Sequence, residues 1–391
     1  MKLYKTPILA QISVAHMVSH VHFMVIPALV PLLPAALGVS YTEIGIAIGV
    51  FNVVSALIQT PMGFATDRHG PYVVLKAGLA VGSAALLSFA FLASYSWLLV
   101  VAALTGAANG VYHPADYAIL SRTTQEASIG RAFSLHSFSG FVGSAITPGL
   151  LTAITAYWNI RAAFVVAGAM GVIALLLLLV SHPGDEFTPK KEEKKDKPAS
   201  AANIFALPIL MLVLLFIFMS LVSTALERFS VATFMQGFGI SLPMANAALT
   251  AYLACSAFGV LLGGLLADRT KHHGFVAMAA FGLGILIVGA ITLYGPPAFI
   301  VIPAWGVMGF LTGVIVPSRD MLIRKVAPAG AEGKTFGIVF TGFNIGGAIG
   351  PICMGYLIDH AMPKAVFGSA IAFMVGIVLI TWLQEKNYFR K

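Results

Sequence analysis

Three histidines lie within nine consecutive residues of an otherwise apolar segment, AHMVSHVHF at 15–23. Imidazole nitrogens bind metal ions and also exchange protons near neutral pH, so either chemistry is open to His16, His20 and His22. On a helix, His16 and His20 share a face, whereas His22 points about 200° away from His20. The three rings cannot converge on one ion from a single helix, and the sequence holds no Cys/His cluster with the spacing of metal ligands. We therefore predict no metal site and assign His20 and His22 to proton coupling.

Further ionisable side chains fall inside other apolar segments. They are His113, Asp116, His136, Glu227, Arg228, Arg319 and Asp320. A charged group at the bilayer centre costs about 3 kcal/mol on insertion scales, so such residues usually face a cavity and carry function. We predict that Glu227 carries a transported proton and that Arg228 binds an anionic group through its planar fork, with a mutually neutralised structural pair as the alternative. His113 is the second predicted substrate-binding residue.

One group of charged residues lies near the ends of these segments and is predicted to form a cytoplasmic gate. It comprises Asp116, Arg319 and Asp320, together with the loop residues Asp67, Arg68, Asp268 and Arg269. Ion pairs between two halves of the molecule would close the inner mouth when the outer one is open. Substrate contact and snorkelling to the interface are the alternatives. Asp116 and Arg319 have opposite charges and lie 203 residues apart, so we predict that they pair across an internal repeat.

The elements that position these residues are membrane-spanning helices. Of the 391 residues, 59% are hydrophobic and 10% are charged, whereas a soluble domain carries about 25% charged residues. Twelve apolar segments are long enough to span a bilayer, the first at 8–37 and the seventh at 204–236. Most of the 23 Lys and Arg fall on the side that holds both termini, which places the termini in the cytoplasm by the positive-inside rule. The net charge of +8 therefore reflects orientation and indicates no nucleic-acid partner.

An internal repeat divides the chain in two. Pro114 and Pro148 lie 203 residues before Pro317 and Pro351. The stretch between the repeats is polar, charged and proline-containing, as is typical of a solvated linker. Two pseudo-symmetric halves in one orientation are typical of transporters whose substrate path lies between the halves. The predicted parts are a six-helix half at 1–181, a cytoplasmic linker at 182–203 and a second six-helix half at 204–391.

Four short motifs carry a family resemblance. GFATDRHG at 63–70 resembles the loop 2–3 signature of the major facilitator superfamily, and GLLADR at 264–269 is similar to its partial repeat. VPLLPAALGVSYTEIG at 30–45 and GVYHPADYA at 110–118 are similar to exporters of the fosmidomycin-resistance type. The resemblance implies alternating access, a cavity lined by helices 1, 4, 7 and 10, and proton-driven export of a small anionic or amphipathic compound. The ionisable residues above, all but one of them on those four helices, agree with it.

We predict an all-α integral membrane protein that is a secondary transporter and not an enzyme. No Gly-x4-Gly-Lys-Ser/Thr loop is present, and we expect no cofactor. Its expected partners are a small-molecule substrate, protons and the lipid bilayer, and we expect a monomer in a bacterial plasma membrane. A proton-coupled uptake symporter for an organic anion is the nearest alternative. A metal transporter and a non-transporting membrane sensor are the others.

Overall fold

A computed structural model describes residues 8–125, 129–181, 207–270, 272–326 and 332–388. In these ranges every regular element is helical, and 12 helices are long and apolar enough to cross a membrane. The predicted linker at 182–203 lies outside the described residues. The elements are α1 (Ile8–Leu29), α2 (Leu33–Leu37), α3 (Tyr41–His69), α4 (Pro71–Ser88), α5 (Tyr95–Thr123), α6 (Ile129–Tyr157), α7 (Ile160–Ser181), α8 (Leu207–Ser223), the π-helical turn η2 (Thr224–Arg228), α9 (Ser230–Phe238), α10 (Leu242–Arg269), α11 (His273–Tyr294), α12 (Ala298–Val326), α13 (Glu332–Asp359) and α14 (Pro363–Tyr388).

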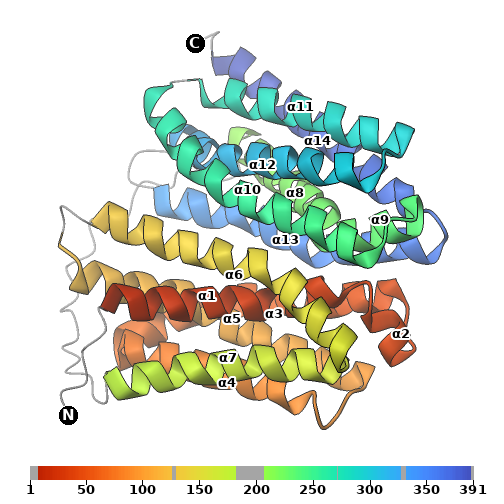
Figure 1. The fold of residues 1–391 in the computed structure, drawn as a ribbon. Coiled ribbons are helices and arrows are strands. Elements are labelled where there is room, and N and C mark those ends of the chain that lie inside the picture. Colours follow the sequence, from red (N-terminus) through yellow and green to blue (C-terminus); the bar gives the residue numbers. More distant parts are fainter. Residues whose placement is uncertain (1–7, 126–128, 182–206, 271, 327–331, 389–391) are drawn as a thin grey trace. The chain divides into compact units, whose positions relative to one another are not determined.

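Contacts group the chain into two compact units. The first contains Met1–Val39 and Ile46–Lys191, and the second contains Ser40–Gly45 and Glu192–Lys391. In the first unit α1 packs against α5, α6 and α7, and α4 packs against α5 and α7 (Figure 1). Helix α1 is the most enclosed of the candidate spans, with 72% of its most apolar window buried. The histidines of α1 therefore face neighbouring helices rather than lipid.

The first apolar segment is not the single span predicted at 8–37. Helix α1 ends at Leu29 and a separate short helix, α2, follows at Leu33–Leu37. Pro31 and Pro34 lack the backbone N–H that a continuous helix would use, so the chain turns between the two helices. A tight turn closes there with a hydrogen bond from Leu32 N to Leu29 O at 2.9 Å.

In the second unit the predicted seventh span is interrupted at its charged residues. The π-helical turn η2 separates α8 from α9, and the N–H of Phe229 donates to Thr224 O at 3.1 Å across five residues. The indole N–H of the fully buried Trp305 donates to Leu226 O at 3.3 Å and satisfies a carbonyl of the irregular turn. π-helical turns are rare and frequently occur at functional sites. Glu227 and Arg228, which lie in η2, are therefore candidate functional residues.

Helices α10 and α12 pack closely along their length in the second unit. A Cβ atom at Gly309 would lie 2.0 Å from Tyr252 O, so only glycine permits this approach. Trp305, Phe234 and Phe367 form an aromatic core beside the contact, with ring centroids 4.9–5.1 Å apart. This core fixes α9, α12 and α14 around the interrupted helix.

Candidate functional site

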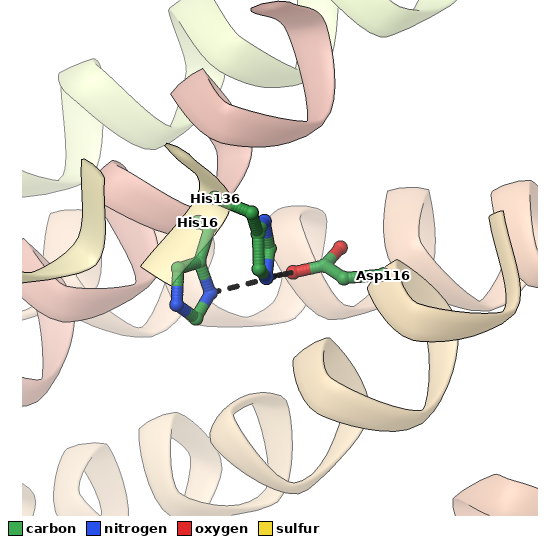
Figure 2. Close-up of side chains that lie close together, drawn as sticks. All are labelled: His16, Asp116 and His136. Carbon is green, nitrogen blue, oxygen red and sulfur yellow. Dashed lines mark ion pairs between the residues drawn. The ribbon is translucent and has the colours of Figure 1, made fainter. Parts of the chain in front are cut away.

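A buried cluster of two histidines and one aspartate forms where three helices of the first unit meet. His16 comes from α1, Asp116 from α5 and His136 from α6 (Figure 2). Asp116 Oδ2 lies 3.4 Å from His16 Nδ1 and 3.6 Å from His136 Nε2. Their exposed fractions are 3% for His16 and 0% for Asp116 and His136. We call these three residues the His–Asp cluster.

The carboxylate of the His–Asp cluster is buried and lacks hydrogen-bond donors among the described residues. Neither oxygen of Asp116 receives a hydrogen bond of normal length from any residue that the structure describes, although both are buried. Burial of an anion without hydrogen bonds is unfavourable unless a proton or a cation neutralises it. The two imidazoles are the groups placed to provide or share that positive charge.

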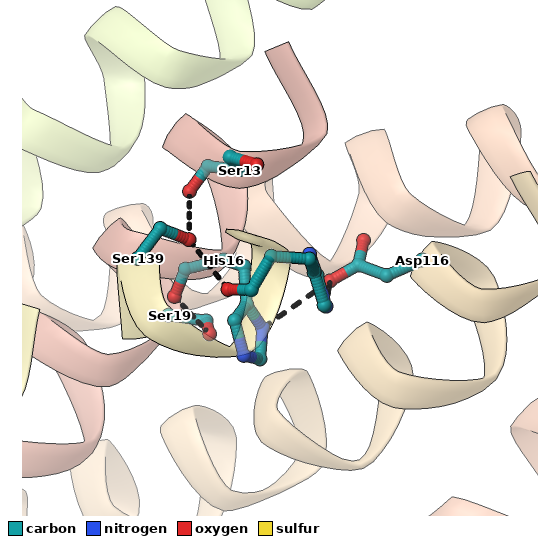
Figure 3. Close-up of polar contacts among 6 residues, drawn as sticks. Ser13, His16, Ser19, Asp116 and Ser139 are labelled. Carbon is teal, nitrogen blue, oxygen red and sulfur yellow. Dashed lines mark hydrogen bonds and ion pairs between the residues drawn. The ribbon is translucent and has the colours of Figure 1, made fainter. Parts of the chain in front are cut away.

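Small residues on α6 make room for the histidine rings. A Cβ atom at Gly140 would lie 2.7 Å from His20 Nε2 and 2.8 Å from His16 Nε2. Ser139, next to Gly140, places its hydroxyl 2.8 Å from Ser13 O and 2.6 Å from His136 O. Its single proton can donate to either carbonyl, so the hydroxyl links the backbones of α1 and α6 at the level of the cluster (Figure 3).

The backbone of α1 is also held at His16. Ser19 Oγ donates to His16 O at 2.7 Å within the helix (Figure 3). The rings of His16 and His136 stack with centroids 3.8 Å apart and an interplanar angle of 26°. These contacts define both the position and the orientation of the cluster.

Two further histidines, His20 and His113, lie next to His16 of the cluster. The His16 ring centroid lies 4.7 Å from that of His20 and 5.4 Å from that of His113. His20 Nδ1 lies 2.9 Å from Ser144 Oγ on α6. Since the side chain of His113 is exposed, the imidazoles form a path from an accessible surface of the unit to a fully buried carboxylate.

His22 lies on the opposite side of α1, as its helical spacing predicts. Its Nε2 atom lies 3.0 Å from Ala167 O on α7, and 5% of the residue is exposed. The structure thus brings His16, His20 and His113 together and separates His22 from them. Sequence reasoning gave no role to His136, because spacing along one helix cannot show which residues of another helix it meets.

The second unit presents a carboxylate and a guanidinium in η2. Glu227 is half-buried and accepts a hydrogen bond of 3.4 Å from the hydroxyl of Tyr252 on α10. Arg228 is 7% exposed, beside Glu227 in the same turn. The arrangement places a carboxylate with its own hydroxyl donor next to an enclosed cation.

Arg319 on α12 occupies an aromatic cage. Its guanidinium carbon lies 5.5 Å from the ring centroid of Phe216, 5.7 Å from Phe340 and 5.9 Å from Phe343. Its Nε also donates to Asp320 Oδ1 at 3.1 Å. The cage lies within the second unit, whereas Asp116 belongs to the first, so their pairing across the halves stays a prediction.

The remaining predicted gate residues lie at helix ends. Asp67, in the last turn of α3, lies 3.9 Å from Arg122 at the end of α5, with side-chain exposed fractions of 80% and 36%. Arg68 follows Asp67, and Asp268 and Arg269 end α10, all three exposed. Exposed ion pairs contribute about 0–1 kcal/mol, so the gate function of these residues stays a prediction.

The sequence matches the Major Facilitator Superfamily over residues 12–235 and 229–389. The chain belongs to this superfamily. The fosmidomycin resistance protein of Escherichia coli K12 is 25% identical over 97% of this chain and 93% of its own length. A multidrug resistance efflux pump PmrA homologue of Lactococcus lactis is 22% identical, with 94% and 92% covered. The crystal structure of a bacterial homologue of the human lysosomal transporter Spinster, inward-facing and occupied, aligns at a TM-score of 0.76 and 16% identity, covering 97% and 96%.

These relatives confirm several predictions. The chain is a multi-pass membrane transporter with the helical fold of the superfamily, and it is not an enzyme. Resemblance to the fosmidomycin-resistance type is also confirmed. The names of the relatives point to export.

Proposed function

We propose that the protein exports a small anionic or amphipathic organic compound from the cytoplasm in exchange for protons. Two six-helix halves, with both termini in the cytoplasm of a bacterial cell, would alternate access across the plasma membrane. Export is supported by the names of the relatives, a fosmidomycin resistance protein and a multidrug efflux pump. Fosmidomycin is therefore the first compound to test.

The observation that carries the exchange mechanism is the Glu227–Arg228 pair in η2. A carboxylate that alternates between charged and neutral forms changes the electrostatic environment of the adjacent guanidinium. When Glu227 is ionised, its carboxylate accepts a hydrogen bond from the substrate while Arg228 binds the anionic group of the substrate with two parallel hydrogen bonds. When Glu227 takes up a proton, this acceptor is lost and the substrate is released, so the proton and the substrate are bound in turn. In this scheme the proton and the substrate influence each other through one turn of helix.

Irregular backbone suits this role. Membrane-embedded helices depart from regular geometry where they line a protein-enclosed or water-filled cavity. The hydroxyl of Tyr252 donates to Glu227, and the indole of Trp305 satisfies the backbone of η2 at Leu226. These contacts hold the turn in place while the charge of Glu227 changes.

The other predicted roles complete the proposal. His113 is the substrate-facing residue of the first unit, in keeping with its exposed ring. The charged residues at helix ends serve as the cytoplasmic gate. The assignment of His20 and His22 to proton coupling stays a prediction, and the Glu227 mechanism does not depend on it.

Proteoliposomes under an imposed pH gradient test this function. Radiolabelled fosmidomycin, followed by a panel of anionic antibiotics, should accumulate in the compartment from which protons leave. Glu227→Gln should lose the response to the gradient. Glu385→Gln is the matched control, because Glu385 is a carboxylate of the same unit that contacts Lys325 at 3.4 Å instead. Transport that ignores the gradient contradicts exchange, and accumulation on the side to which protons flow indicates uptake by symport.

A further inference from the structure

We propose that the first unit binds one divalent transition-metal ion, with Zn²⁺ as the reference ion, between His16 Nδ1, Asp116 Oδ2 and His136 Nε2. Each residue offers one ligand atom from a different helix, and the three atoms lie within 4.8 Å of one another. Binding at this site is independent of the direction and the coupling ion of transport. The proposal reverses the prediction of no metal site, which considered spacing along single helices, whereas these three ligands come from α1, α5 and α6.

The distances in the His–Asp cluster fit tetrahedral coordination. Ligand atoms about 2.0–2.1 Å from a zinc ion at tetrahedral angles are roughly 3.4 Å apart. Asp116 Oδ2 lies 3.4 Å from His16 Nδ1 and 3.6 Å from His136 Nε2, so two of the three edges already have this length (Figure 2). The third edge, between the two imidazole nitrogens, is at most 4.8 Å.

The ligand types select the kind of ion. Two imidazoles and one carboxylate suit zinc, nickel and cobalt, whereas magnesium and calcium require oxygen ligands. A three-residue set leaves a fourth position for water. We therefore expect Zn²⁺, Ni²⁺ and Co²⁺ to compete for this site and Mg²⁺ to be excluded from it.

Electrostatics favour an ion at this place. Asp116 is fully buried, and no described residue gives either of its oxygens a hydrogen bond. A bound cation would replace the missing donors, in the way that buried charges are commonly compensated by a metal. His16 Nδ1 and His136 Nε2 likewise have no hydrogen-bond partner among the described residues, so binding would break no existing hydrogen bond.

Two neighbouring histidines provide a route by which a metal ion can reach the His–Asp cluster. His113 is exposed, and the ring centroids of His113 and His20 lie 5.4 Å and 4.7 Å from that of His16. These two imidazoles form a path by which a metal can reach the buried ligands. Once bound, the ion would tie α1, α5 and α6 together. Because the ligands are 0–3% exposed, we expect slow release, which indicates a resident ion rather than a transported one.

The test is metal binding to the purified full-length protein in detergent, after removal of any affinity tag. Equilibrium dialysis and calorimetry with Zn²⁺ should show one site that excess Mg²⁺ does not displace. His16→Gln, Asp116→Asn and His136→Gln should each weaken Zn²⁺ binding by at least about 10-fold, since loss of a supporting residue alone has that effect. His22→Gln and His360→Gln are the controls and should leave it unchanged. His22 is a buried histidine of the same helix, and His360 is exposed in the second unit.

Co²⁺ provides a readout that does not depend on the stability of the variants. In the unaltered protein it should give the strong visible absorption of a tetrahedral site, and added Zn²⁺ should remove that absorption. Failure of the unaltered protein to bind either ion overturns the proposal. So does binding that persists in the folded His16→Gln/His136→Gln double variant, which would assign the ion to surface histidines. Neither result depends on whether the chain exports fosmidomycin.

Discussion

Asp116 in the first unit and Arg319 in the second are charged residues with very different surroundings. In the first unit, α1, α5 and α6 surround the Asp116 carboxylate with imidazole rings. In the second, α8, α12 and α13 surround the Arg319 guanidinium with the phenyl rings of Phe216, Phe340 and Phe343. The two charged residues are 203 positions apart, the spacing of the predicted internal repeat. The first unit therefore encloses an acidic side chain in imidazoles, and the second encloses a basic side chain in phenyl rings.

The difference lies in how each charge is stabilised. Arg319 interacts with the negative faces of aromatic rings and with the carboxylate of Asp320, and 17% of its side chain is exposed. Asp116, in contrast, is completely buried, and the charged groups it contacts are two imidazole nitrogens. The comparison suggests a division of labour. The buried carboxylate of the first unit is placed to attract positive species, whereas Arg228 and Arg319 place positive charge in the second.

Reversing the charge of Asp116 should have the largest effect on the stability of the protein. Asp116→Arg would bury an unpaired cation among histidines, and we expect it to destabilise the protein by about 3–5 kcal/mol. Asp116→Asn, which removes the charge and keeps the shape, should fold. Thermal unfolding followed by size-exclusion chromatography measures both. A well-folded Asp116→Arg protein would show that the buried position between the histidines does not require a negative charge.

The second prediction concerns anion recognition in η2. Arg228→Gln should weaken binding of the transported anion by about 2 kcal/mol or more, the loss expected for one partner of an enclosed charge pair. Arg228→Lys should recover only part of that loss, because an ammonium group lacks the planar fork. Substrate concentration dependence of transport in proteoliposomes provides the measurement. Equal affinities in all three proteins would remove Arg228 from the binding site.

A larger side chain at Gly140 should have a smaller effect on stability. In Gly140→Ala the new methyl group would lie 2.7–2.8 Å from His16 and His20, and overpacking of this kind costs about 1–3 kcal/mol. Gly149→Ala is the matched control on the same helix, because nothing lies within 4 Å of its new Cβ. It should be neutral or stabilising by up to about 1 kcal/mol. Similar melting temperatures for the two variants would contradict the close packing of α1 against α6.

Substitution of Arg319 within the aromatic cage should have the smallest effect on stability. Arg319→Lys keeps the positive charge but loses the flat contact with three rings, so we expect destabilisation of about 0.5–1 kcal/mol. Arg122→Lys is a suitable comparison, because Arg122 forms an exposed ion pair at a helix end. Thermal unfolding in the same detergent measures both variants. Greater destabilisation from Arg122→Lys than from Arg319→Lys would show that the cage adds no stability.

The amino-acid sequence was sufficient to predict the class of fold. Apolar segments of about 20 residues are long enough to cross a bilayer as helices that satisfy their own backbone hydrogen bonds, so the twelve spans could be recognised from hydropathy. The scarcity of ionisable residues within them also made those residues identifiable as candidates. The interruptions were not predicted. Pro31 and Pro34 gave a usable signal for the first, whereas nothing in TALER at 224–228 distinguishes a π-helical turn from an α-helical one.

The composition of the His–Asp cluster could not be predicted for a different reason. Spacing along α1 shows correctly that His22 is separated from His16 and His20, because one helix has a fixed angle per residue. The rotation of α5 and α6 about their own axes is set by packing, at sites such as Gly140, and not by local spacing. Only the structure shows that Asp116 and His136 meet His16. The same argument explains why the aromatic partners of Arg319 were missed.

The central claim, exchange of a compound for protons through Glu227, is tested most directly by following both fluxes in the same proteoliposomes. Vesicles loaded with a pH-sensitive dye would receive fosmidomycin, then each anionic antibiotic of the panel, with no imposed gradient. We predict that movement of a transported compound drives protons in the opposite direction in the unaltered protein and in Glu385→Gln, and that Glu227→Gln abolishes the proton signal. Compound movement without any proton signal in the unaltered protein, or no movement of any compound, would contradict the account.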